Sequence, residues 1–398
     1  MKVEGRRLKE EGSGNWKFKT SSPVWAEVDL KAIAHNVREL RRIADPGARL
    51  MAVVKANAYG HGASEVARQA LQSGADFLGV ARLDEGIRLR KEGIEAPVLI
   101  FGYTSPNHAR ELLDFNLTQT VSSYEAAEAL SEIAVSYGKN IKIHLKIDTG
   151  MGRQGIVVSD LKPQTGRQAL TEVESVARLQ SLELEGIYTH FAASDSSDKS
   201  FAKKQYQIFT DFLDRVSGLD IPLKHVANSG AIIDLPETHL DMVRAGIALY
   251  GLYPSDAVDK SRAVLKPAMA LKAKVAFMKK VPPGFKISYG MTYQTEKPTT
   301  IATIPIGYAD GFSRLLSSRG FMLVCGCRAP IVGRVCMDMT MLDVGHIVPE
   351  VSLEEEVVIF GRQGNSSITV DEIASALNTI SYEIVSAITA RVPRIYLR

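Results

Sequence analysis

Between about residue 30 and residue 254 the chain alternates amphipathic stretches with short apolar runs. The amphipathic stretches predict helices at residues 30–42, 63–73, 83–92, 105–114, 123–137, 166–179 and 200–216. The apolar runs predict strands at residues 50–55, 75–81, 96–102, 117–121, 141–147, 182–190, 223–227 and 240–245. Strands that are mostly apolar suit a parallel sheet covered by crossover helices. Eight of them is the strand count of a (β/α)8 barrel, and a doubly wound sheet is the alternative.

After about residue 254 the pattern changes to β-branched runs separated by turn residues such as Pro282-Pro283-Gly284, which indicates a mainly β domain. We therefore predict a flexible N-terminal extension at residues 1–23, a (β/α)8 barrel at residues 24–260 and a β-rich C-terminal domain at residues 261–398. The first 23 residues lack the apolar core of a signal peptide, and the apolar runs elsewhere are too short to span a bilayer. We expect a cytoplasmic protein that does not bind membranes.

Composition narrows the function classes. The 398 residues include 45% hydrophobic and 23% charged side chains, which is typical of a globular chain with a large core. A net charge of +3 is too small to indicate a nucleic-acid surface. The three cysteines, Cys325, Cys327 and Cys336, fit a reducing compartment, and Cys325-Gly326-Cys327 has no second pair to complete a zinc site. We expect no metal site.

Polar residues recur where the predicted strands end. In a barrel of this kind, reactive groups gather at the carboxyl ends of the strands, where the βα-loops begin. Any one of these residues could be structural, for example a buried core histidine, a surface ion-pair partner or a helix cap. Their recurrence at the same end of successive strands favours a common site. The residues are Lys55, Lys146, Asp148, His190, Asn228, Ser229 and Arg244.

Two of these positions indicate a particular chemistry. Lys55 closes an apolar run and precedes a Gly-containing turn, so its amine can be partly desolvated and lose its proton, as Schiff-base chemistry requires. The alternative is a strand-end lysine whose ammonium reaches water. Ser229 with Gly230, and Gly246 with Ile247, offer small residues and backbone amides at turns, the arrangement that binds a phosphate.

Residues 53–62, with the sequence VVKANAYGHG, resemble the cofactor-lysine motif of alanine racemases. Those enzymes use pyridoxal 5′-phosphate and combine a (β/α)8 barrel with a β-rich C-terminal domain. Further segments resemble the family in the same order, at residues 148–155, 188–195, 225–231, 243–254, 288–293, 304–311, 333–344 and 391–396. The resemblance runs from about residue 24 to the end of the chain.

The resemblance implies a two-base racemisation of L-alanine and D-alanine that supplies D-alanine for cell-wall peptidoglycan. Lys55 would hold the cofactor and act as the base on one face of the α-carbon. Tyr289, from the C-terminal domain of the other subunit of a homodimer, would be the base on the opposite face. His190 would contact this tyrosine, and Arg244 would lie behind the histidine and face the pyridine nitrogen of the cofactor.

The resemblance also implies the remaining contacts. Lys146 matches a lysine that is carbamylated in many members, and an unmodified lysine is the alternative. The substrate-binding residues would be Arg153, Tyr308, Met337 and Asp338, the last near the substrate entry. The cofactor-binding residues would be Lys55, Tyr59, Arg153, His190, Asn228, Ser229, Arg244, Gly246, Ile247 and Tyr382. The sequence departs from the family pattern at Gln154, where an aliphatic residue is frequent, and at Met291, where a small one is frequent.

Three other functions stay open at this point. The first is a racemase of serine or of several amino acids. It would differ from an alanine racemase by little more than the room beside the substrate's β-carbon, which Tyr382 would limit. A barrel-type amino-acid decarboxylase would share the cofactor site and use a cysteine such as Cys336. A non-catalytic cofactor carrier would not need the C-terminal domain that supplies Tyr289 and Met337.

Overall fold

The computed structural model describes residues 22–159 and 163–398. The predicted N-terminal extension lies outside these residues as far as position 21. The described chain divides into two compact units. One contains residues 29–268 together with Arg398, and the other joins residues 22–28 to residues 269–397.

Eight parallel strands close into a barrel in the first unit. Their order is β5-β4-β3-β2-β10-β9-β8-β6, and a pairing of β5 with β6 completes the ring, while the short β7 pairs with β6. Each predicted strand overlaps one of the observed barrel strands, so the barrel is confirmed and the doubly wound sheet is wrong. The strands are β2 (Arg49–Val53), β3 (Phe77–Val80), β4 (Val98–Ile100), β5 (Thr118–Val121), β6 (Ile141–Asp148), β7 (Ile156–Val157), β8 (Leu182–Tyr188), β9 (Leu223–His225) and β10 (Met242–Ala245).

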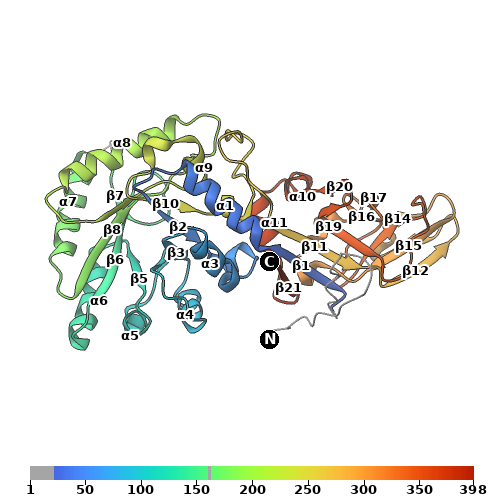
Figure 1. Ribbon diagram of the computed structural model, residues 1–398, viewed down its shortest axis with the longest axis horizontal. Helices are drawn as coiled ribbons and strands as arrows, with labels where there is room; N and C mark the ends of the chain where they lie inside the picture. Colours follow the sequence, from blue (N-terminus) through green and yellow to red (C-terminus); the bar gives the residue numbers. More distant parts are fainter. Residues whose placement is uncertain (1–21, 160–162) are drawn as a thin grey trace. The chain divides into compact units, whose positions relative to one another are not determined.

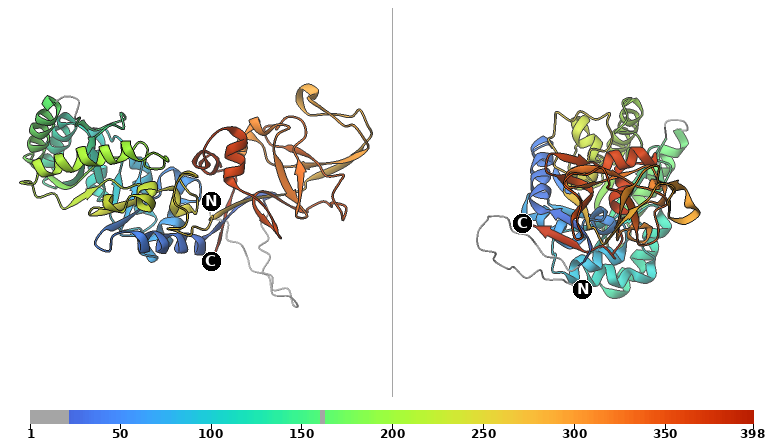
Figure 2. Two further views of the ribbon diagram at one scale, coloured as in Figure 1. Left: turned by 90° about the horizontal axis from the view of Figure 1, so that it is seen from above. Right: turned by 90° about the vertical axis from the view of Figure 1, so that its right-hand side faces the viewer.

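Helices surround these strands on the outside (Figures 1 and 2). The first begins where Asp29 accepts hydrogen bonds from the amides of Lys31 and Ala32, and it buries Ile33 and Leu40. No helix of the described residues is long and apolar enough to cross a membrane. The helices are α1 (Leu30–Ile43), α2 (Lys55–Tyr59), α3 (Ala63–Gln72), α4 (Leu83–Lys91), α5 (Ala109–Asp114), α6 (Tyr124–Tyr137), α7 (Pro163–Ala177), α8 (Ser200–Arg215) and α9 (Ser229–Asp234), with short 3-10 turns η1 (Pro106–His108), η2 (Pro236–Thr238) and η3 (Ile247–Tyr250).

Strand β6 shows why polar residues gather inside the barrel. Successive side chains of a strand point to opposite faces. The odd-numbered positions from Ile141 to Ile147 are apolar and buried, whereas the even-numbered ones are Lys142, His144, Lys146 and Asp148. His144 meets His225 of β9, and Lys146 lies over the Tyr188 ring at the end of β8. The even-numbered side chains therefore face neighbouring strands across a polar barrel interior.

The second unit is mainly β. A sheet runs in the order β17-β16-β19-β11-β1-β21, with β20 beside β19, and two smaller sheets contain β12-β15-β18 and β13-β14. Val281, Ile287, Ile301 and Val332 form a buried apolar cluster. The strands are β1 (Val24–Asp29), β11 (Met269–Lys274), β12 (Phe277–Val281), β13 (Lys286–Ile287), β14 (Tyr293–Gln294), β15 (Thr299–Ile304), β16 (Phe321–Val324), β17 (Cys327–Pro330), β18 (Thr340–Asp343), β19 (Glu356–Gln363), β20 (Ser366–Ile368) and β21 (Arg394–Leu397); the helices are α10 (Val370–Leu377) and α11 (Ser381–Ser386), with the 3-10 turns η4 (Tyr289–Met291), η5 (Tyr308–Asp310) and η6 (Arg314–Leu316).

Candidate active site

Lys55 lies two residues beyond β2, at the start of a turn with unusual backbone angles. Four consecutive residues that are not glycine, from Ala56 to Tyr59, have φ between 50° and 56°. A left-handed turn costs roughly 1–2 kcal/mol for each L-residue, and such strain is often found at functional sites. Glu85 of α4 pins the start of the turn, since its carboxylate accepts from the amide of Ala56 at 2.6 Å. The turn therefore holds Lys55 in a fixed place at the carboxyl end of the strand.

The surroundings of Lys55 favour the uncharged amine. Burial lowers its pKa from the ordinary value of a lysine, and the positive charge of Arg153 lowers it further, while Glu85 opposes the shift. A lysine with a lowered pKa carries a larger fraction of its neutral, nucleophilic form. The surface-lysine alternative does not fit these surroundings.

A small cradle lies between the turn after Lys55 and the turn after β10. A Cβ atom added to Gly246 would lie 3.1 Å from the hydroxyl of Tyr59 and 3.6 Å from Oγ of Ser229. The amides of Gly246 and Ala248 donate to Ser229 Oγ at 2.9 Å and 3.3 Å. A serine oxygen accepts two hydrogen bonds, so the O–H of Ser229 remains as a donor. The hydroxyls of Tyr59 and Ser229 thus surround the space that Gly246 leaves open, and hydroxyl donors suit a phosphate group.

Asn228 supports this cradle from behind. It is the N-cap of α9, and its Oδ1 accepts from the amide of Ala231 at 3.1 Å and from Ser194 Oγ at 2.6 Å. The oxygen is thereby occupied within the protein. Asn228 fixes the start of the helix and with it the position of Ser229.

The loop after β6 carries Arg153. Asp148 holds the first part of this loop, because its carboxylate accepts from the amides of Gly150, Met151 and Gly152. The last part is held by Gln154, whose side-chain amide donates to the carbonyl of Phe101 at 2.8 Å. The exposed Arg153 therefore projects from a loop that is tied at both ends.

Lys146 is buried inside the barrel, with 2% of its surface exposed. Its Nζ donates to the carbonyl of Ile147 at 2.9 Å and lies 5.1 Å from the centre of the Tyr188 ring. Burial, together with the charge of Arg244, lowers the pKa of Lys146 to about 7, although Asp148 raises it. A large fraction of this amine is neutral near pH 7.

Arg244 sits at the end of β10 and bonds to four groups. Its Nη1 donates to Nδ1 of His225 at 2.8 Å, and its Nη2 donates to Nδ1 of His190 at 3.0 Å and to the carbonyls of Thr189 and Val226. Burial lowers the pKa of Arg244 to about 10, so the guanidinium stays charged at neutral pH. Burial and the charge of Arg244 hold the pKa of His190 well below its ordinary value, so this imidazole is neutral.

In the second unit, Tyr289 projects from a tight turn and is 71% exposed. Ser288, Gly290 and Met291 have φ of 65°, 70° and 51°. The turn is fastened by Ser288, whose hydroxyl donates to the carbonyl of Arg334 at 2.7 Å and lies 3.5 Å from the sulfur of Cys336. A phenol is thus presented to the outside of this unit from a strained, well-anchored turn.

Three other predicted residues, Tyr308, Met337 and Asp338, belong to two neighbouring segments of the same unit. The amides of Tyr308 and Ala309 donate to the carbonyls of Cys336 and Met337 at 3.1 Å and 3.0 Å, so the two segments run side by side. Gly307 permits the approach, because a Cβ there would come within 2.2 Å of the Met337 carbonyl oxygen. Asp338 accepts from Arg391 at 2.7 Å.

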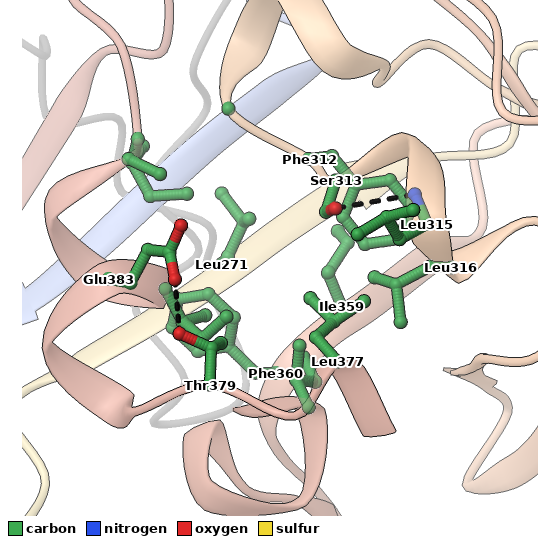
Figure 3. A pocket seen from close by; sticks show the side chains of 15 residues that line it. Leu271, Phe312, Ser313, Leu315, Leu316, Ile359, Phe360, Leu377, Thr379 and Glu383 are labelled. Atoms are coloured by element: carbon green, nitrogen blue, oxygen red, sulfur yellow. Dashed lines mark hydrogen bonds between the residues drawn. The ribbon is translucent and has the colours of Figure 1, made fainter. Parts of the chain in front are cut away.

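Tyr382 belongs to α11, which borders an apolar cavity of about 110 Å³ in the second unit (Figure 3). Glu383 accepts a hydrogen bond from Thr379 at its edge, and the labelled walls are mostly apolar, for example Leu271, Phe312 and Phe360. A carboxylate and apolar walls do not suit a phosphate. Of these two places, the cradle at Gly246 has the chemistry that suits a phosphate.

Comparison with known proteins decides the family. The family model "Alanine racemase, N-terminal domain" matches residues 28–254, and "Alanine racemase, C-terminal domain" matches residues 268–396. The chain belongs to the alanine racemase family. The alanine racemase of Desulfosudis oleivorans is 55% identical to it over 94% of this chain and 96% of that protein.

Solved structures of alanine racemases agree with the fold. The enzyme of Clostridium difficile 630 superposes with a TM-score of 0.89 at 40% identity, over 95% of this chain and 97% of the other. A structure from Bartonella henselae, described as an alanine racemase with covalently bound pyridoxal phosphate, has a TM-score of 0.83 at 27% identity and covers 94% and 100% of the two chains. These matches confirm the predicted resemblance and the predicted fold class.

Within the barrel, the predicted racemase residues lie at the carboxyl ends of the strands. The sequence interpretation missed two residues that touch them, Tyr188 and His225. Tyr188 stacks on His225 with ring centres 4.6 Å apart, and its hydroxyl bonds to Thr120. It also missed His144 and Glu185 deeper in the barrel. Polar residues at alternate positions of apolar strands were the signal that could have revealed them.

Proposed function

We propose that the chain interconverts L-alanine and D-alanine with pyridoxal 5′-phosphate, as a homodimer whose active sites combine residues of both subunits. The observation that carries the proposal is the position of Lys55. Its amine has a lowered pKa, and the turn that begins there ends at Tyr59, whose hydroxyl lines the phosphate cradle. An amine that can react with the carbonyl group of a cofactor thus lies one turn away from a cradle that suits a phosphate.

The residues present fit this cofactor. Tyr59, Ser229, Gly246 and Ile247, with Tyr382, would hold the phosphate, and Asn228 would position Ser229. Arg153 would bind the phenolic oxygen, Arg244 the pyridine nitrogen, and Lys55 would make the covalent attachment. When bound, the cofactor supplies an electron-withdrawing ring that acidifies the α-C–H bond of an attached amino acid.

Racemisation needs a proton to leave one face of the α-carbon and a proton to arrive on the other. The amine of Lys55 serves one face, and the phenol of Tyr289 of the partner subunit serves the opposite face. A free tyrosine has a pKa of about 10, so on the order of one in a thousand is ionised at neutral pH. The anion needs stabilisation.

His190 provides this stabilisation in our proposal. Its Nδ1 accepts from Arg244, and its imidazole is neutral, so the ring hydrogen is on Nε2. That N–H can donate to a phenolate oxygen, while the charge of Arg244 lies directly behind it. Arg244 and His190 together would lower the pKa of Tyr289 of the partner subunit.

The second unit would shape the substrate pocket. Met337 and Tyr308, held side by side by backbone hydrogen bonds, would place the substrate carboxylate with the help of Arg153, and Asp338 would lie near the entry. Tyr382 would limit the room beside the β-carbon and favour alanine. Racemisation of serine or of several amino acids is the second candidate, since a methyl and a hydroxymethyl group differ little in size.

We also propose that Lys146 carries a carbamate. Its amine is largely neutral near pH 7, so it can attack CO₂ to form a carbamate with release of one proton. The resulting anion would face the cationic Arg153. Incubation with ¹³C-bicarbonate should then give one slowly exchanging carbamate resonance that is absent from Lys146→Met.

We also propose that the protein is cytoplasmic and that it supplies D-alanine for the cell wall.

The test is incubation with L-alanine in heavy water. Exchange of the α-proton with loss of optical rotation supports a racemase, whereas release of CO₂ with an amine product would indicate a decarboxylase. Tyr289→Phe should lose this activity and keep the cofactor absorbance. A wild-type protein that shows the cofactor absorbance but no activity would instead indicate a carrier. A parallel rate with L-serine separates the two racemase candidates.

A further inference from the structure

A chain of hydrogen bonds leads from Arg244 through the barrel interior to a carboxylate. Arg244 Nη1 lies 2.8 Å from Nδ1 of His225, His225 Nε2 lies 2.9 Å from Nδ1 of His144, and His144 Nε2 lies 3.2 Å from Oε2 of Glu185. Both histidines are fully buried, and Arg244 is 4% exposed. The mechanism proposed above uses only the first of these four residues.

The chemistry of the two ends sets the direction of every bond. A guanidinium has donors and no acceptor, so Nδ1 of His225 must accept from Arg244. The hydrogen of His225 is then on Nε2 and is donated to Nδ1 of His144. The hydrogen of His144 is consequently on Nε2 and is donated to Glu185. Burial lowers the pKa of both imidazoles, which agrees with one hydrogen on each.

The opposite direction is incompatible with the bond to Arg244. If the hydrogen of His144 were on Nδ1, it would point at Nε2 of His225, and the hydrogen of His225 would move to Nδ1. Two donors would then face each other across the contact between His225 and Arg244. Glu185 at the far end only accepts, so it favours the same tautomers that Arg244 requires, and the two ends of the chain reinforce each other.

Neighbouring residues hold the side chains of Glu185 and His144 in place. Thr118 and Lys142 donate to the two carboxylate oxygens of Glu185 at 3.2 Å and 3.1 Å. Burial opposes ionisation of Glu185, but its bonds to His144 and Lys142 hold its pKa at about 2. Gly186 has no side chain and so leaves room for the imidazole of His144, because a Cβ at this position would lie 2.6 Å from that ring.

We propose that Glu185 is a positioning residue for the reaction: it fixes the tautomers of His144 and His225 and thereby keeps Arg244 hydrogen-bonded in the orientation that serves the cofactor and His190. The inference rests on the proposed function through the role of Arg244. Glu185 touches neither substrate nor cofactor in this proposal.

The test compares Glu185→Gln with Glu183→Gln in the purified, cofactor-loaded protein. Glu183 is the matched control, since its carboxylate also faces Lys142, at 3.6 Å, on the same strand. In Glu185→Gln the new NH₂ group can donate to Nε2 of His144 and favour the reversed tautomers. Glu185→Asp keeps the charge and lengthens the contact, and it serves as the second variant if Glu185→Gln does not fold.

The first readout is the ¹⁵N spectrum of histidine-labelled protein, with resonances assigned by substitution of single histidines. We expect wild type and Glu183→Gln to show His144 and His225 protonated on Nε2 alone, and the Glu185 variants to show both tautomers. The second readout is racemisation, where kcat should fall roughly tenfold, the value of one charge-assisted hydrogen bond, with KM unchanged.

Unchanged tautomers in the Glu185 variants would overturn the inference, and so would mixed tautomers with unchanged kcat. The tautomer comparison needs no substrate. If the wild-type protein does not racemise alanine, the proposed function is wrong. The tautomers of His144 and His225 can still be compared in that case, so the two failures are distinguishable. A loss of thermal stability alone, with wild-type tautomers, would assign Glu185 a merely structural role.

Discussion

Arg244 donates from Nη2 to Nδ1 of His190 over 3.0 Å, which places a buried cation directly behind a neutral imidazole. The same guanidinium bonds to His225 and to two carbonyl oxygens. An arginine so fully bonded cannot readily give a proton to a pyridine nitrogen. If Arg244 faces the cofactor ring, the ring should therefore be a weaker electron sink than one paired with a carboxylate.

Replacing Arg244 with Glu tests this idea. A carboxylate would favour protonation of the ring nitrogen and lengthen the life of the deprotonated substrate, so side reactions such as transamination should increase relative to racemisation. The measurement is pyruvate formed per racemisation event from alanine. Arg244→Lys, which keeps a cation, is the control and should give little pyruvate. Equal pyruvate from wild type and Arg244→Glu would contradict the prediction.

A shared active site predicts complementation between inactive subunits. Lys55→Ala and Tyr289→Phe should each be inactive as homodimers, because each lacks one of the two bases. After mixing, dissociation and reassociation, each mixed dimer should contain one intact site, since both defects fall in the other site. Recovery of L-alanine racemisation checks this. Persistent inactivity, with mixed dimers demonstrated by mass spectrometry, would refute a site built from two subunits.

Sequence periodicity was sufficient to predict the barrel, because each parallel strand is a short apolar run that can be recognised without knowledge of its neighbours. It could not show what β1 would pair with. The sequence pattern predicts that the barrel region begins at residue 24, yet Val24–Val28 pair with Met269–Ala273 of β11 in an antiparallel register. An isolated strand pattern carries no information about so distant a partner.

The candidate site was partly visible in the sequence. Lys55 was expected at the end of a strand, and the left-handed turn that follows it could not be foreseen, because alanine rarely adopts positive φ and Ala56 and Ala58 both do so. His144 and Glu185 lie within β6 and β8, away from the strand ends where the sequence pattern predicts reactive groups. Their meaning depends on contacts between neighbouring strands, which exist only once the barrel has closed.

Gln154 is predicted to stabilise the loop that carries Arg153. Gln154→Leu restores an aliphatic residue and removes the hydrogen bond to Phe101, which should cost about 1 kcal/mol. The loss is local, so amide hydrogen exchange in residues 149–155 should accelerate while the barrel strands exchange as before. Exchange rates in the loop equal to those of wild type would show that Asp148 alone holds it.

The cradle at Gly246 predicts a steric effect on cofactor binding. In Gly246→Ala the new methyl group would lie 3.1 Å from the Tyr59 hydroxyl, where a phosphate oxygen is expected. Overpacking of this kind typically costs about 1–3 kcal/mol, or roughly fivefold in affinity at the lower end. Titration of the cofactor-free protein with pyridoxal 5′-phosphate measures the effect. Gly218→Ala is the control because a Cβ there meets nothing within 4 Å.

Lys146 predicts a specific dependence of stability on pH. Its pKa of about 7 in the folded protein lies below the ordinary value of 10.5. Between these two values the unfolded chain binds a proton that the folded protein does not, so the free energy of unfolding should rise with pH. The gain in the free energy of unfolding is on the order of 5 kcal/mol across this window and is lost below about pH 7.

Urea unfolding of wild type and Lys146→Met in CO₂-free buffer, from pH 7 to pH 10, measures this term. Methionine is close to lysine in volume and does not titrate, so the variant should lack the rise and should be the more stable protein at the low-pH end of the window. Added bicarbonate should stabilise wild type and leave Lys146→Met unchanged, because only the lysine can form the carbamate. Parallel stability curves for the two proteins would mean that Lys146 keeps an ordinary pKa in the folded barrel.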